Sequence, residues 1–177
     1  MKLIDLSRYG GIGSNCLLIE IGGLRVIVDA GIHPKKMGKE TLPAFESLKP
    51  GDVDLIVLTH CHLDHLGALP VLTRQLPNTP VITTPATEIL AKRMLHNSCS
   101  VMERQKTEFG IGAYPLFTRS EVERTRRQMI PFQPGNPRVL DTKTGERVML
   151  SLHAAGHLPG ATGLLLEHNH RKVFFTG

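Results

Sequence analysis

Three histidines and one aspartate lie within six consecutive positions, at His60, His62, Asp64 and His65. Imidazole nitrogens and carboxylate oxygens are common ligands of zinc and related divalent ions. His60 and His62 are two residues apart, so an extended segment can direct both rings at one ion. Asp64 and His65 would turn towards a second metal position as the next helix begins. The spacing predicts a metal site with two adjacent positions rather than a hydrogen-bonded surface loop.

A further ligand is predicted at His157, which lies in a loop of small residues at 154–161 that would let an imidazole approach a metal. On its own, a histidine in such a loop is more often a hydrogen-bonded turn residue. Here His60 and His62 leave a tetrahedral zinc one protein ligand short, because catalytic zinc sites commonly have three protein ligands and a water. His157 is therefore the expected third ligand.

A short apolar run at 54–58 directly precedes the metal-binding segment and is typical of a strand buried on both faces. Two runs rich in branched residues, at 14–21 and 24–29, are joined by two glycines and predict a β-hairpin. Residues 81–83 predict another strand, after which Thr84 can cap a helix that begins with proline. This order predicts an α/β fold with the ligands at a strand's carboxyl end.

The carboxyl-terminal third of the chain has a different pattern. Ser120 and Glu123 form a capping-box pair that opens a shorter helix, and this helix should end before Pro131. Four successive strands joined by turn-forming residues are predicted after it, at 138–140, 147–153, 163–167 and 172–176.

Composition is that of an ordinary soluble domain, with 177 residues, 41% hydrophobic and 21% charged. No apolar run approaches the roughly 20 residues of a membrane span, and Asp5 interrupts the stretch where a secretory signal would be apolar. The three cysteines form no C-x-x-C pair, so free thiols and a cytoplasmic location are expected. The net charge of +5 favours an anionic partner.

These motifs resemble the metallo-β-lactamase fold, through residues 28–31, the H-x-H-x-D-H segment at 60–65 and the Gly156-His157 loop. Finer details look like the β-CASP branch, which includes ribonuclease J and the endonuclease of pre-mRNA 3′-end cleavage. These details lie at 66–70, 84–98, 115–118, 155–160 and 174–177. The resemblance runs from about the first glycines to the last residue. It implies an α/β fold of the αββα-sandwich type, of which residues 1–177 would form the amino-terminal half, and di-zinc hydrolysis of RNA.

Carried over residue by residue, the resemblance places His60, His62 and His157 in the first zinc site. Asp64 and His65 belong to the second site, and Asp64 would also hold or orient the attacking hydroxide. Asp29 matches an aspartate that fixes the metal-binding loop by hydrogen bonding, and it could equally cap the turn that follows it.

The chain departs from the family pattern at Gly177, where the family continues with an aspartate that bridges the two metals. The β-CASP insertion and the carboxy-terminal half are also absent. We therefore expect a weak or empty second site, with one zinc bound and slow or no turnover of RNA. Apolar faces of the strands at 164–166 and 173–175 should be exposed and could drive homo-oligomerisation or strand exchange near Phe174.

Two rival functions use the same metal motif. One is a small-molecule metallohydrolase acting on thioesters or lactones, against which the β-CASP-like residues at 67–70 and 86–98 argue. The other is a non-catalytic, metal-stabilised binding module, which the missing aspartate and the basic balance would favour. RNA remains the expected partner.

Three features near these motifs are not expected to act in the site. His33 should be an ordinary surface residue, and Cys61 should point away from the neighbouring ligands. The glycine-rich run at 10–13 lacks the Lys-Ser/Thr ending of a phosphate loop and is expected to be a flexible turn.

Overall fold

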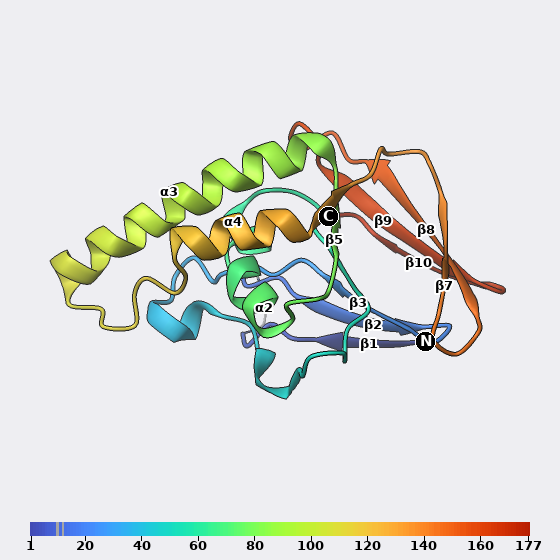
Figure 1. Cartoon of the computed structure of the whole chain (residues 1–177), viewed down its shortest axis with the longest axis horizontal. Helices are drawn as coiled ribbons and strands as arrows, with labels where there is room; N and C mark the ends of the chain where they lie inside the picture. Colours follow the sequence, from blue (N-terminus) through green and yellow to red (C-terminus); the bar gives the residue numbers. More distant parts are fainter. Residues whose placement is uncertain (10, 12) are drawn as a thin grey trace.

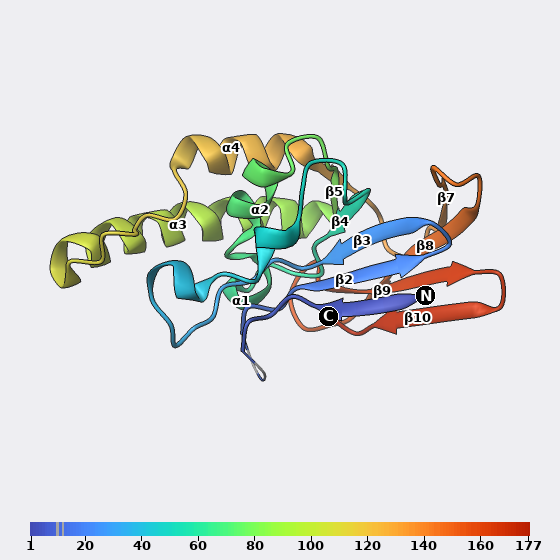
Figure 2. The same cartoon turned by 90° about the horizontal axis from the view of Figure 1, so that it is seen from below.

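The computed structural model describes residues 1–9, 11 and 13–177. Two β-sheets pack face to face, and the helices cover the outer side of the first sheet (Figures 1 and 2). This layering confirms the predicted α/β fold. The predicted turn at 10–13 lies partly outside the described residues. No helix among those described is long and apolar enough to cross a membrane.

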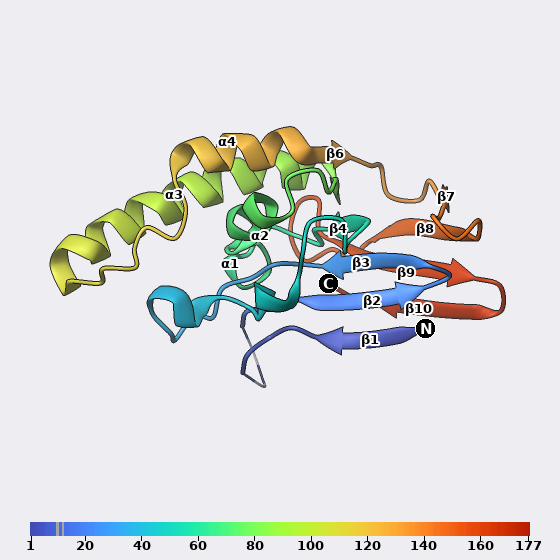
Figure 3. The same cartoon turned by 60° about the horizontal axis from the view of Figure 1, so that its bottom comes forward.

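The first sheet has six strands in sequential order (Figure 3). They are β1 (Lys2–Asp5), β2 (Leu17–Ile21), β3 (Leu24–Val28), β4 (Leu55–Val57), β5 (Val81–Thr83) and β6 (Met129–Pro131). The strands from β3 to β6 are parallel, so β3, β4 and β5 all end at one edge of the sheet. Open parallel sheets bind ligands at this edge, and the metal-binding residues follow these strand ends.

The predicted hairpin is confirmed, since Ile21 pairs with Leu24 across a two-residue turn. Gly22 and Gly23 have φ values of 54° and 77°, as the favoured tight hairpin turn requires of both central residues. Glycine adopts this left-handed conformation without steric cost. The hairpin thereby fixes the register that delivers the residues after β3 to the site.

The helices are α1 (Leu63–Leu66), α2 (Leu69–Gln75), α3 (Pro85–Phe109) and α4 (Arg119–Gln128), with short 3₁₀ turns at Gly38–Thr41 and Phe45–Ser47. The predicted cap of α3 is confirmed, because the Thr84 side chain accepts a hydrogen bond from the amide of Thr87. The predicted cap of α4 is wrong. Thr118 rather than Ser120 caps this helix, in a reciprocal pair with Glu121.

The second sheet is antiparallel and contains β7 (Arg138–Asp141), β8 (Arg147–Ala154), β9 (Thr162–His168) and β10 (Arg171–Phe175). All four predicted strands are confirmed. The edge strands β1 and β6 of the first sheet were not predicted.

The two sheets share an apolar core formed by buried residues such as Val26, Val57, Leu150 and Leu164. The expectation of exposed apolar faces is wrong for the residues that point inwards, because Leu164 and its neighbours pack against the first sheet of the same chain. Only the outward side chains remain exposed, of which Phe174 is 52% exposed. A second core lies between the first sheet and the helices.

Candidate metal centre

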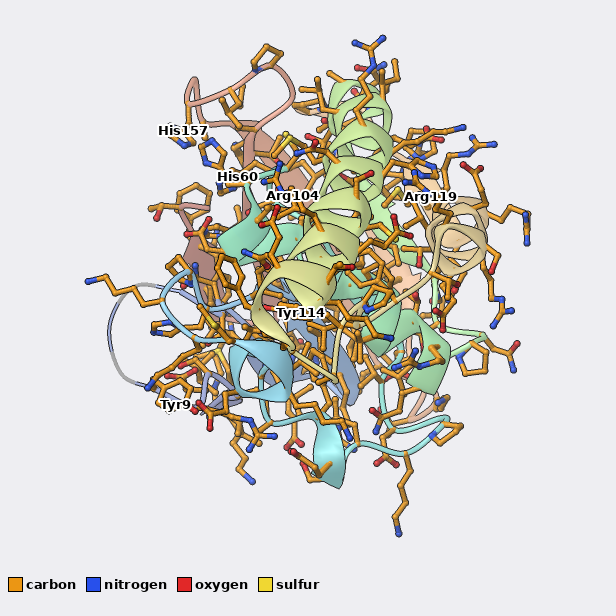
Figure 4. The ribbon with its side chains drawn as sticks, turned by 90° about the vertical axis from the view of Figure 1, so that its left-hand side faces the viewer. Tyr9, His60, Arg104, Tyr114, Arg119 and His157 are labelled. Carbon is orange, nitrogen blue, oxygen red and sulfur yellow. The ribbon has the colours of Figure 1, made fainter. Side chains whose placement is uncertain are left out.

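Three imidazoles from two distant loops converge at the carboxyl edge of the first sheet. Ligand nitrogens of His60, His62 and His157 all lie within 4.8 Å of one another. Nδ1 of His62 is 3.2 Å from Nε2 of His157, although 95 positions separate the two residues. Figure 4 shows His60 and His157 on neighbouring segments at the same end of the molecule. The structure therefore brings together the three histidines that the sequence singled out.

The spacing of one pair of these nitrogens fits a tetrahedral zinc ion. Zinc–nitrogen bonds of about 2.0–2.1 Å at tetrahedral angles place two ligand nitrogens about 3.3 Å apart, close to the separation of the His62 and His157 atoms. The three histidines differ in solvent exposure: His60 is buried, His62 is half-buried and His157 is exposed. A cluster that is closed on one side and open on the other leaves room for a ligand that is not a protein group.

His60 is held in the form that binds metals. Burial lowers its pKa to about 4, and the neighbouring His65 ring adds to the effect. Its Nδ1 lies 3.0 Å from the hydroxyl of Thr59, and this hydroxyl in turn donates to the carboxylate of Asp29. With Nδ1–H donating to Thr59, the lone pair of Nε2 is left for a metal.

Asp29 anchors this chain of hydrogen bonds. Its carboxylate accepts the backbone N–H of Thr59 at 2.8 Å and lies 2.7 Å from Nδ1 of His65. The residue is buried and has a φ of 61°, a left-handed conformation that aspartate tolerates better than most residues. These contacts are those needed to fix the metal-binding loop. The described contacts of the carboxylate include none to the turn that follows it.

Asp64 and His65 lie together beside the three histidines, with Oδ2 of Asp64 3.6 Å from Nε2 of His65. Burial alone would lower the pKa of the His65 ring, but the hydrogen bond and the charge of Asp29 outweigh burial and raise this pKa. The side-chain amide of Asn15 lies 3.1 Å from the same Nε2 and also donates to the carbonyl of Asp64. Asn15 was not singled out from the sequence, because no motif marks a residue 50 positions away.

The segment after β3 packs directly on the metal-binding segment. The amide of Ala30 donates to the carbonyl of His65 at 2.7 Å, and Ile32 donates to Leu63 at 2.9 Å. A Cβ atom at Gly31 would overlap the carbonyl oxygen of Asp64. Glycine is therefore required at this position by the close approach of two backbones.

The loop that carries His157 is tied to the start of α3. The carbonyl oxygen of Gly160 accepts hydrogen bonds from the hydroxyls of Thr84 at 2.8 Å and Thr87 at 3.0 Å. Thr87 is fully buried, and Thr84 nearly so. The sequence predicted Thr84 only as a helix cap, so this second task of the residue comes from the fold.

A cleft of about 620 Å³ opens beside the metal centre, and both His62 and Asp64 line it. His33, which is expected from the sequence to be an ordinary surface residue, also lines the cleft. Cys61 is buried in the core under the helices, which confirms that it points away from the ligands. All three cysteines are free and buried.

The profile of the Metallo-beta-lactamase superfamily matches residues 9–177. This chain belongs to that superfamily. Among curated relatives, this chain is 29% identical, over the whole length of the chain, to "Probable RNase MJ4" of Methanocaldococcus jannaschii. It is 28% identical to "Ribonuclease TTHA0252" of Thermus thermophilus. It is 26% identical to "Cleavage and polyadenylation specificity factor 73" of Drosophila melanogaster. The chain spans 38%, 37% and 24% of the lengths of these proteins.

These relatives confirm the resemblance to the β-CASP branch. Solved structures agree on the fold. A protein of unknown function from Enterococcus faecalis has a TM-score of 0.60 at 17% identity, covering 99% of this chain and 42% of its own. A HARLDQ-motif metallo-beta-lactamase from Cronobacter sakazakii has a TM-score of 0.55 at 18% identity, covering 98% of this chain and 61% of its own.

Proposed function

We propose that this chain carries the metal centre of a zinc-dependent hydrolase of phosphodiester bonds in RNA. The observation that supports the proposal most strongly is the convergence of His60, His62 and His157, with Asp64 and His65 beside them. The relatives whose printed names are ribonucleases point to RNA as the substrate class. Zinc is the proposed metal because three neutral imidazoles with an open fourth position are typical of catalytic zinc.

Bound zinc would supply a nucleophile from water near neutral pH and neutralise charge on the phosphoryl oxygens. The protein's part is to place the groups. Asp64 is half-buried and is held near His65, so its carboxylate can orient the attacking group at the second position. Asp29 and Thr59 fix the rings of His65 and His60, respectively, by hydrogen bonding.

Asp64 and His65 are the two described residues that we assign to the second metal position, and the Asn15 amide lies against His65. We therefore propose that zinc binds tightly at the first position and weakly at the second. Turnover of RNA by this length of chain is then slow, because phosphoryl transfer at such centres uses two ions to stabilise the attacking and leaving oxygens.

A cytoplasmic location fits the three free thiols. We also propose that residues 1–177 are the amino-terminal part of a larger metallo-β-lactamase domain. Self-association would use the outer face of the second sheet, where Phe174 and Val139 are exposed. A concentration series in light scattering that gave only the monomer mass would contradict the self-association.

Cleavage of a fluorescent RNA, with and without chelator, tests the proposed function. We expect slow cleavage that stops with chelator and in His157→Ala. The matched control is His170→Ala, which removes an exposed turn histidine outside the site. Cleavage that survives both chelator and His157→Ala would contradict the proposal. Turnover of thioesters or lactones without any cleavage of RNA would favour the rival small-molecule hydrolase instead.

A further inference from the structure

The cleft beside the metal centre has its own architecture. It is lined by residues of α3 and of the segment that follows β3, together with His62 and Asp64. In Figure 4, α3 runs towards the viewer, His60 and His157 lie beside it, and Tyr114 lies below them. The volume of the cleft, about 620 Å³, falls within the usual range of about 300–1,000 Å³ for small-molecule sites.

The walls of the cleft are mainly apolar. Met94, Val101 and Met102 line it from α3, and Ile32 and Tyr114 line it from the facing loops. Methionine side chains are flexible and polarizable, so they pack well against the face of a flat ring. Walls of this kind suit a planar heterocycle better than a strongly hydrated group.

A few polar residues in these walls have side chains without a hydrogen-bond partner in the described part of the chain. Ser98 is only 4% exposed and lines the cleft, yet no described residue hydrogen-bonds to its hydroxyl. Asn97 and Gln105 line the same cleft, and their side-chain amides make no hydrogen bond to any residue in the described part of the chain. Hydroxyl and amide groups can both donate and accept, which is what the edges of nucleobases require.

The charge at the cleft agrees with a nucleotide. Lys36 lines it, and the ammonium group lies 4.6 Å from the centre of the Tyr9 ring, which restrains the lysine side chain. An ammonium group at this place attracts a phosphate of a nucleic-acid strand. His62 and Asp64, which also line the cleft, belong to the metal centre that would hold the neighbouring phosphate.

We propose that this cleft binds the base of a ribonucleotide adjacent to the phosphate that is held at the metal centre. The inference rests on the proposed function and deepens it, because it assigns a place for one nucleotide of the substrate. The base lies between the apolar walls, and Ser98, Asn97 and Gln105 bond to its edge. Lys36 contacts the sugar–phosphate backbone on the outer side.

Calorimetric titration of the zinc-loaded protein tests the proposal. The probes are the four nucleoside 5′-monophosphates and ribose 5-phosphate, which has the same phosphate and sugar but no base. At least one nucleotide should bind about tenfold more tightly than ribose 5-phosphate, as contacts to a base typically provide. Equal affinities for the five probes would overturn the proposal. Decanoate that binds in the cleft and displaces the nucleotides, with no advantage of a base, would assign the cleft to an acyl chain and also overturn it.

Two variants of α3 locate the binding. Val101→Glu places a charge in the wall of the cleft and should remove the advantage of the base. The matched control is Ile89→Glu on the same helix, at a residue that is 61% exposed and outside the cleft; it should retain the advantage. Gln105→Ala should weaken nucleotide binding severalfold without changing the melting temperature. Base-dependent binding that is unchanged in both Val101→Glu and Gln105→Ala would overturn the proposal.

Repeating the titration without zinc separates this inference from the proposed function. The advantage of a base over ribose 5-phosphate should persist, because the cleft walls do not depend on the metal. If zinc fails to bind but the advantage remains, the metal centre is wrong and the cleft is right. If zinc binds and the advantage is missing, the reverse holds.

Discussion

The hydroxyl of Thr87 donates to the carbonyl oxygen of Gly160 across 3.0 Å, although 73 positions separate the two residues. Thr84 makes a second hydrogen bond to the same oxygen. His157 is the most exposed of the three clustered histidines, so its loop has the least support from surrounding packing. The first turn of α3 thus provides a fixed attachment for the loop that delivers the third imidazole.

Thr87→Val removes one of these hydroxyls and keeps the shape of the side chain. We expect zinc affinity to fall about tenfold, since groups that orient metal ligands typically contribute about 10–100-fold. Competition with a chromophoric chelator measures this change. Thr73→Val is the control, because Thr73 is also a buried helical threonine with hydrogen bonds but lies outside the site. Equal losses of affinity in the two variants would contradict a positioning role for Thr87.

Gly160→Ala tests the same attachment by steric means. Gly160 has a φ of 84°, and a Cβ atom there would lie 2.5 Å from the hydroxyl oxygen of Thr84. Gly145 has a nearly identical φ of 81° with open space around it, so Gly145→Ala carries the backbone strain alone. We expect Gly160→Ala to weaken zinc binding at least about tenfold, and Gly145→Ala to leave it unchanged. Cobalt absorption spectra of both variants would report the coordination directly.

Asp29→Asn should damage both stability and metal binding. Asparagine keeps the left-handed backbone that Asp29 adopts, but its amide group cannot accept all the hydrogen bonds from Thr59 and His65. We expect a loss of about 1–3 kcal/mol in the free energy of unfolding, measured with urea, and weaker zinc binding. Asp54→Asn is the control, because Asp54 also accepts a backbone N–H between strands and lies away from the site. It should lower stability without changing zinc affinity.

Much of this architecture could be predicted from local signals. The Gly22-Gly23 turn and the apolar strand before the metal segment each act within a few residues, and both are found as expected. His60 and His62 of the H-x-H-x-D-H segment lie in one cluster with His157. The edge strands β1 and β6 were missed because neither has a clear alternating pattern. Strand β1 is mostly exposed, and β6 ends in a proline.

Other features depend on contacts that no local pattern encodes. Thr118 with Glu121 and Ser120 with Glu123 have the same capping spacing, so sequence alone could not choose between the two pairs. The fold chooses because Glu123 instead bonds to Lys92 and His96 of α3. In the same way, Asn15 contacts His65, and Thr87 contacts the loop that carries His157, only because distant segments pack together.

The cap of α4 gives a test of pH dependence. Burial alone would raise the pKa of Glu121, but the Thr118 amide and the Arg74 guanidinium outweigh burial and lower it. A lowered pKa means that the ionised group stabilises the folded state at neutral pH and that this stabilisation is lost as the pH falls through the lowered pKa.

Glu121→Gln should therefore be less stable than the parent protein by roughly 0.5–1 kcal/mol at pH 7, and the difference should shrink towards pH 3. Urea unfolding at the two pH values measures it. Glu108→Gln, which alters an exposed ion pair at the end of α3, is the control and should have little effect at either pH. A difference that grew as the pH fell would contradict this account.

We propose above that His60, His62 and His157 bind one zinc ion. Crystals grown with zinc, with data collected on both sides of the zinc absorption edge, would locate the ion through its anomalous signal. We expect one strong peak about 2.0–2.1 Å from a nitrogen of each of the three imidazoles. A peak bound elsewhere, or no peak among these three rings at saturating zinc, would contradict it.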